Sequence, residues 1–195
     1  MRILGVDSSG MVASVALVED DLLVAEYSVN YKKTHSQTLL PMLDEIVKMT
    51  ELDLNTIDAI AVAAGPGSFT GLRIGAATVK GLGLALEKPV ISVPTCHGLA
   101  YNLWGSDKLI CPIMDARRSQ VYTGIYEFRG NTMEVLEPQM AVDIEVIAEK
   151  LCRYGRNVVF LGDGVPVFRQ KLESGLLEQL TAAGNQFAFA PAHVN

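Results

Sequence analysis

The sequence predicts the same order of strands and helices twice, once in each half of the chain. A short apolar strand ending in Asp7 opens the first half, and a similar strand ending in Asp115 opens the second half. Two strands joined by a polar turn follow each of them, over residues 13–29 and 120–136. A helix, a strand and a second helix complete each half. This repeat predicts an α/β fold of two related lobes, each with the order β-β-β-α-β-α.

Hydrophobic patterns set the bounds that we expect for the remaining elements. Segment 36–50 has apolar residues at helical spacing, and the continuous apolar run 57–64 is typical of a buried strand. We expect further strands over 89–93 and 157–161, and further helices over 70–86, 96–104, 143–151 and 167–180. The expected lobes span residues 1–100 and 101–195, with the connection near 94–108.

Composition and charge narrow the class of protein. With 49% hydrophobic and 19% charged residues, the chain is typical of a well-packed globular protein. Its net charge of −6 argues against binding nucleic acid alone, because phosphate contacts need clustered Lys and Arg. The three cysteines form no metal or disulfide motif, so we expect reduced thiols in a cytoplasmic protein. We also expect no signal peptide and no membrane-spanning segment.

A glycine-rich loop at residues 65–75 connects a predicted strand to a predicted helix. Gly65 and Gly67 permit backbone angles that other residues avoid, and either Ser68 or Thr70 is suited to cap the helix. The free N–H groups at the start of the helix suit an anion. The loop lacks the Lys of a P-loop and the third Gly of the dinucleotide fingerprint, so a tight turn without a ligand is the competing interpretation.

The helix that follows this loop is rich in small residues. Glycine lowers helix stability by roughly 1 kcal/mol relative to Ala, so several glycines in one helix indicate a close contact with another element. Gly71 and Gly75 share one face at i, i+4, where a second backbone can approach. Packing against the chain's own sheet is the alternative. In the preceding helix, Met42 and Met49 suit an adaptable contact, so the two helices predict a docking surface.

Four groups of residues, in this order along the chain, resemble one family. They are Asp7-Ser8-Ser9, His35-Ser36 followed by Leu39-Leu40-Pro41, the loop 65–75, and Asp115-Ala116-Arg117-Arg118 followed by Val121-Tyr122. Together they resemble the TsaB (YeaZ) family of the actin, sugar-kinase and Hsp70-like superfamily, over nearly the whole chain. The resemblance implies two duplicated ribonuclease H-like lobes, as in actin-like ATPases. Members usually extend further than this chain does, so we expect the second lobe to be truncated after Asn195.

The resemblance implies a non-catalytic subunit rather than an enzyme. TsaB-like proteins bind and activate TsaD, which acts with the ATPase partner TsaE in threonylcarbamoylation of adenosine 37 in tRNAs that read codons beginning with A. It implies contact with tRNA only through that complex, no membrane, and a homodimer through the same helices when the chain is alone. It implies no catalytic residue, no metal and no firmly bound cofactor, and leaves open a nucleotide at the interface with TsaD. The interface residues that we expect are Leu39, Leu40, Leu43, Ile46, Leu72, Ile74, Gly75, Ala76 and Val79.

An autonomous ATPase or phosphotransferase is the alternative function. Enzymes of the superfamily need phosphate-binding loops in both lobes, and an Asp at the first strand end can position a metal. An Asp that caps its own turn is the simpler interpretation of Asp7. TsaD-type enzymes carry two metal-binding histidines one helical turn apart, whereas His35 stands alone between Tyr31 and Leu39. The residues that correspond to vestigial phosphate loops are Asp7, Ser8, Ser9, Gly65, Gly67, Ser68, Gly162 and Gly164.

Overall fold

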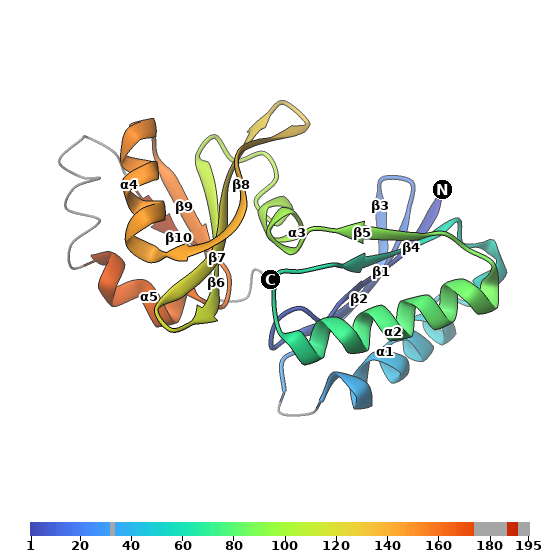
Figure 1. Cartoon of the computed structure of the whole chain (residues 1–195). Coiled ribbons are helices and arrows are strands. Elements are labelled where there is room, and N and C mark those ends of the chain that lie inside the picture. Colours follow the sequence, from blue (N-terminus) through green and yellow to red (C-terminus); the bar gives the residue numbers. More distant parts are fainter. Residues whose placement is uncertain (32–33, 174–186, 191–195) are drawn as a thin grey trace. The chain divides into compact units, whose positions relative to one another are not determined.

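The computed structural model describes residues 1–31, 34–173 and 187–190 (Figure 1). The chain separates into two compact units, residues 1–95 and 96–195, which we call lobe 1 and lobe 2. The division predicted from the sequence, between residues 100 and 101, lies inside helix α3 (Thr95–Tyr101). All of α3 except its first residue belongs to lobe 2.

Lobe 1 contains sheet 1, a five-stranded sheet with the order β3-β2-β1-β4-β5. The first three strands are antiparallel neighbours, whereas β4 pairs in parallel with β1 and β5 in parallel with β4. The strands are β1 (Arg2–Asp7), β2 (Ala13–Glu19), β3 (Leu22–Val29), β4 (Ala59–Ala63) and β5 (Val90–Val93). The helices are α1 (His35–Met49) and α2 (Phe69–Leu86), with a 3-10 helix at Leu54–Thr56.

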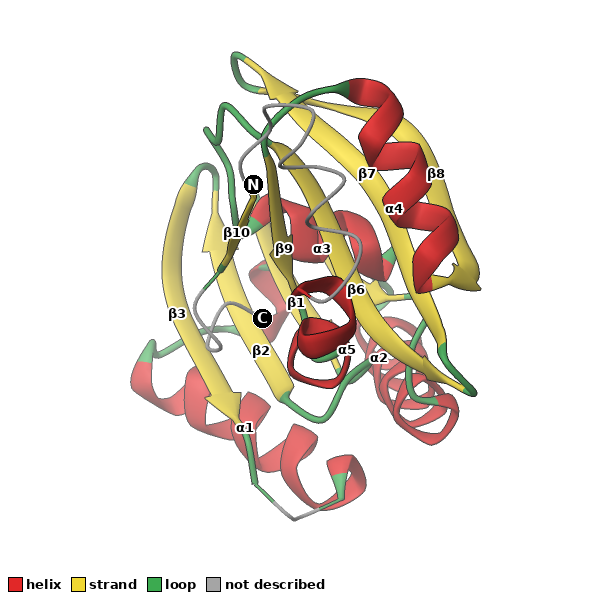
Figure 2. Cartoon of the chain, turned by 90° about the vertical axis from the view of Figure 1, so that its left-hand side faces the viewer, coloured by secondary structure: helices red, strands yellow, loops and turns green. Residues whose placement is uncertain are grey.

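Lobe 2 repeats this arrangement in sheet 2, whose order β8-β7-β6-β9-β10 matches that of sheet 1 strand for strand (Figure 2). The antiparallel and parallel pairs also correspond. The strands are β6 (Leu109–Arg117), β7 (Gln120–Arg129), β8 (Thr132–Asp143), β9 (Val158–Leu161) and β10 (Phe187–Phe189). The helices after α3 are α4 (Ile144–Tyr154) and α5 (Val165–Lys171). The expectation of two duplicated α/β lobes is confirmed.

The hydrophobic cores lie between helices and sheets. In lobe 1, inward side chains of β1, β2 and β4 pack against α1 and α2, which cover one face of sheet 1 (Figure 1). In lobe 2, alternate residues along β6 and β9 point to opposite faces, as strand geometry requires. One set packs with α4 and α5, and the other packs with α3.

Several bounds differ from those that the sequence predicts, as β8 and α5 illustrate. Strand β8 continues to Asp143 instead of ending near residue 136, so the strand runs directly into α4. Asp143 does occupy the N-cap position of α4, but its side chain makes no capping hydrogen bond. Helix α5 begins at Val165, and the part of the expected helix from residue 174 onward lies outside the described residues. Among the helices that the structure describes, none is long and apolar enough to cross a membrane.

Candidate functional site

The first candidate phosphate loop, at the end of β1, is covered by the start of α2. The Ser8 hydroxyl donates a hydrogen bond to the Gly71 carbonyl at 2.9 Å, and the Ser68 N–H donates to the Ser9 carbonyl at 2.6 Å. Ser8 and Ser9 are only 2% and 3% exposed. These contacts close the space above the strand end with the chain's own backbone.

Three glycines make this close contact possible. A Cβ added to Gly67 would lie 2.3 Å from the Ser9 carbonyl oxygen, and one added to Gly71 would lie 2.1 Å from the Ser8 carbonyl oxygen. A Cβ on Gly75 would lie 2.3 Å from the Ser8 hydroxyl. The second backbone that approaches Gly71 and Gly75 is therefore the turn after β1. This corrects the interpretation that their shared face is open to a partner.

The loop itself has the conformation that its residues favour. Gly65 and Gly67 have φ angles of +105° and +157°, values that side chains disfavour. The Gly71 N–H donates to the Ser68 hydroxyl at 3.3 Å, so Ser68 rather than Thr70 caps α2. The predicted cap and the predicted glycine conformations are thus confirmed.

The acidic and histidine side chains near this loop are engaged locally. One carboxylate oxygen of Asp7 accepts a hydrogen bond from the Ser9 N–H at 2.7 Å, which is the turn-capping arrangement. His35 Nε2 lies 3.0 Å from the Gly10 carbonyl oxygen; because a carbonyl only accepts, this nitrogen carries the proton and donates. No group of three or more His, Cys, Asp or Glu in the described part of the chain is arranged to hold a metal ion.

The corresponding loop of lobe 2 is closed in the same way. The Gly164 N–H donates to the Ile113 carbonyl of β6 at 2.9 Å. A Cβ on Gly162, whose φ is +104°, would lie 2.5 Å from that same oxygen. Partial burial of its carboxyl group and the nearby charge of Asp115 raise the pKa of Asp163. Both lobes thus place a glycine loop directly on the first strand or the turn after it, at Ser8 and Ser9 in lobe 1 and at Ile113 in lobe 2.

The expected interface residues divide into three groups. Leu39, Leu43, Ile46 and Val79 lie in the core of lobe 1, no more than 6% exposed, and Gly75 is buried against Ser8. Ile74 is partly buried against that core, while Leu72 and Ala76 line a hollow between α2 and β5. Leu40, at 56% exposed, is the only member that projects freely from the two helices.

The sequence reasoning missed the exposed side of α2. Buried Gly71, Gly75, Val79 and Gly83 recur every four residues, and Ala77, Gly81 and Ala85 form a second series on the exposed side. An added Cβ on Gly81 would meet nothing within 4 Å. Leu84 is 84% exposed and Met49 of α1 is 76% exposed. We call the following exposed residues the helix face: Leu40 on α1, and Ala77, Gly81, Leu84 and Ala85 on α2.

The cysteines are free thiols, as expected. Burial raises the pKa of Cys96 to about 12, and burial also raises the pKa of Cys111 to about 12. A thiol needs to ionise to act as a nucleophile. These two buried groups therefore stay protonated at neutral pH and serve as core residues.

Comparisons with known proteins agree with these observations. The tRNA threonylcarbamoyladenosine biosynthesis protein TsaB of Bacillus subtilis is 36% identical over 90% of this chain and 77% of its own length. The chain belongs to the TsaB family. The TsaB protein of Escherichia coli is 34% identical over 84% of this chain and 72% of its own length. The predicted family is confirmed.

Other matches include a related family model and solved structures. The family model described as TsaD, tRNA N6-adenosine threonylcarbamoyltransferase, matches residues 23–192. A Pseudomonas aeruginosa protein with similarity to peptidase YEAZ has a TM-score of 0.77 and 25% identity, covering 99% of this chain and 85% of its own. The ROK hexokinase of Thermus thermophilus has a TM-score of 0.50 at 14% identity over 99% of this chain and 94% of its own, which supports the fold alone.

Proposed function

We propose that this chain is a non-catalytic subunit in the biosynthesis of tRNA threonylcarbamoyladenosine, and that it binds and activates TsaD through the helix face. Family membership supports the role in this biosynthesis, because the related curated proteins carry that name. The observation that supports this docking surface is the exposure of the helix face. Its apolar and small residues are exposed on two adjacent helices whose opposite sides form the core of lobe 1.

The geometry of the helix face suits a helix of a partner. Gly81 in the middle of an exposed helix lowers helix stability by about 1 kcal/mol relative to Ala and relieves no contact within lobe 1. A partner helix gains close backbone approach over the short side chains of Ala77, Gly81 and Ala85. Leu84 supplies an exposed apolar side chain beside this stripe, and Leu40 supplies another on the neighbouring helix α1. The same surface serves a homodimer when TsaD is absent.

The strand ends support a subunit without phosphate chemistry of its own. In both lobes the candidate phosphate loop packs tightly on the chain's own backbone, with contacts from Gly71 to Ser8 and from Gly164 to Ile113. Asp7 holds its own turn through the Ser9 N–H. We therefore place catalysis in TsaD, with TsaE as the ATPase, a nucleotide at most at the interface between subunits, and contact with tRNA through the complex in the cytoplasm.

The test mixes this chain with TsaD from the same genome and measures mass by size-exclusion chromatography with light scattering. We expect a complex that is lost in the double variant Leu40→Glu, Leu84→Glu, because two carboxylates would be buried without partners. Leu22→Glu is the matched control, since Leu22 is 67% exposed on β3 and outside the helix face. A complex that survives the double variant contradicts the proposed surface.

A second measurement tests the assignment of roles. In a reconstituted modification assay with TsaD and TsaE, product formation should require this chain and should be unaffected by Asp7→Asn. ATP turnover by this chain alone that disappears in Asp7→Asn would instead establish the phosphotransferase function and overturn the non-catalytic one.

A further inference from the structure

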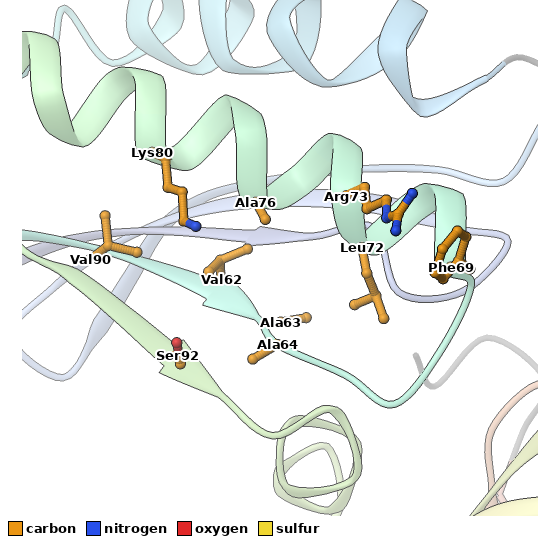
Figure 3. A pocket seen from close by; sticks show the side chains of 10 residues that line it. All are labelled: Val62, Ala63, Ala64, Phe69, Leu72, Arg73, Ala76, Lys80, Val90 and Ser92. Atoms are coloured by element: carbon orange, nitrogen blue, oxygen red, sulfur yellow. The ribbon is translucent and has the colours of Figure 1, made fainter.

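A groove beside β5 shares no residue with the helix face. It has a volume of about 340 Å³ and lies between α2 and strands β4 and β5 (Figure 3). Its lining is mainly apolar, with Val62, Leu72, Ala76 and Val90 among the residues that form it. None of its lining residues comes from α1 or from the helix face. We call this hollow the β5 groove.

Two cations from α2 line this groove without an acidic counterpart. Arg73 and Lys80 both contribute to the lining, which contains no Asp or Glu. Their spacing of seven residues places them about 10 Å apart along the helix, on the same side. The Arg73 guanidinium stacks over the exposed Phe69 ring at 3.7 Å, which holds it in place. Neither cation pairs with a carboxylate of the described residues, so the groove attracts anionic groups.

The wall opposite α2 is the open edge of sheet 1. Strand β5 is the last strand in the sheet order, and the residues from Val90 to Ser92 are exposed. On its inner side, the Pro89 carbonyl accepts from the Ile60 N–H and the Val93 carbonyl accepts from the Ala64 N–H. Because the groups of a parallel strand alternate in direction, the N–H and C=O of Val90 and Ser92 point outward. A new strand can pair with them.

We propose that the β5 groove binds an extended acidic segment of a partner protein, which adds to the edge of sheet 1 as a sixth strand. Strand addition supplies backbone hydrogen bonds, and alternate side chains enter the groove between β5 and α2. Alternate positions of a strand are about 6.6 Å apart, so acidic side chains four residues apart reach Arg73 and Lys80. An apolar side chain midway between them covers Ala76. The recognised pattern is acidic, any, apolar, any, acidic.

The test pans a phage-displayed library of random short peptides against the full chain and measures an enriched peptide by fluorescence anisotropy. We expect enrichment of the acidic–apolar–acidic pattern. Arg73→Gln and Lys80→Gln should each weaken binding about tenfold, because each removes a hydrogen bond to a charged group. Ser92→Pro removes an outward N–H while sparing the bonds to β4, and should also weaken binding about tenfold. Lys48→Gln on α1 is the matched control and should bind as the parent chain does.

Several results would overturn the proposal. They are the absence of any enriched peptide, enrichment without acidic residues, and Ser92→Pro binding that equals the parent's. Displacement of the peptide by free glutarate at equal concentration would show a site for small anions instead of a strand. Circular dichroism of Ser92→Pro confirms that the sheet is intact. Because the β5 groove and the helix face share no residue, failure of this test would not contradict the proposed binding to TsaD.

Discussion

The two lobes have the same strand order and the same closed glycine loops, but their helices differ. In lobe 1, α2 keeps one side exposed along its 18 residues, whereas Val165 and Phe168 of α5, at the corresponding place in lobe 2, are buried. Sheet 2 has a hydrophobic cluster on each face, and α3 covers the second one. Among the described residues, the hydrophobic cluster of lobe 1 lies on the α1 and α2 side alone.

This difference shows which parts of a duplicated fold are constrained. The loop after the fourth strand packs closely on the first strand or the turn after it, and both lobes have glycine there: Gly71 against Ser8, and Gly164 against Ile113. A helix needs only one buried face, and its exposed side is free to acquire another role. In this chain α2 carries most of the helix face and also forms one wall of the β5 groove.

The largest expected effect breaks the closed loop of lobe 1. Gly71→Ala should lower the free energy of unfolding by about 3 kcal/mol, because its Cβ would lie 2.1 Å from a backbone oxygen that cannot move freely. Gly164→Ala in lobe 2 should cost less, since its closest contacts with Ile113 and Asp115 lie at 2.8 to 3.0 Å instead of 2.1 Å. Urea denaturation of the full chain measures both. Equal stability of Gly71→Ala and the open-site variant Gly81→Ala would contradict the closed loop.

The next largest effect is expected from truncating a buried side chain of a helix in either lobe. Leu43→Ala in α1 and Ile147→Ala in α4 should each cost about 2 to 4 kcal/mol, because both side chains are buried and leave a cavity. Leu40→Ala, one turn away on the exposed side, should change stability by less than about 0.5 kcal/mol. Thermal unfolding distinguishes them. A large effect of Leu40→Ala on the isolated chain would show that this residue belongs to the core.

A smaller effect on stability, which depends on pH, should distinguish β7 of lobe 2 from β2 of lobe 1, the second strand of each lobe. Glu127 on β7 is 3% exposed and pairs with Arg156 and Arg129, and these hydrogen bonds hold its pKa below the usual value despite its burial. A lowered pKa means that the pair stabilises the fold above about pH 4.3 and that this stability is lost as the pH falls through the lowered pKa. Glu127→Gln should therefore cost about 1 to 2 kcal/mol at pH 7, and progressively less below pH 4.

The matched control for this variant lies on β2 of lobe 1. Glu19 pairs with Arg2, but both side chains are more than a third exposed, so Glu19→Gln should have little effect at any pH. Denaturation curves at pH 3 and pH 7 test the pair of variants. A cost for Glu127→Gln that is the same at both pH values would exclude the ion pairs as its cause.

The smallest effect sharpens the proposal for the helix face. Gly81→Ala should stabilise the isolated chain by about 0.5 to 1 kcal/mol, because the site is open and Ala favours helix. If a partner backbone approaches at Gly81, the same change should weaken binding to TsaD in titration calorimetry. Higher stability with unchanged affinity would contradict a close helix contact at this position.

Much of the fold was predictable because it depends on local patterns. Apolar runs, polar turns and helical spacing identified nearly every strand and helix that the structure describes, and their repetition indicated two lobes. The conformation of the glycine loop was also predictable, since Gly65 and Gly67 precede a residue suited to cap a helix. These features depend on short-range sterics and hydrogen bonds, which neighbouring residues largely determine.

The orientation of α2 was decided only by tertiary structure. Small and apolar residues lie around most of this helix, so spacing groups Gly71 with Gly75 and Ala77 with Gly81 but does not show which pair faces inward. The turn at Ser8, far away in the sequence, takes up the space beside the first pair and leaves the second exposed. Sequence periodicity therefore determined the two faces, and the contact with the end of β1 determined which one became core.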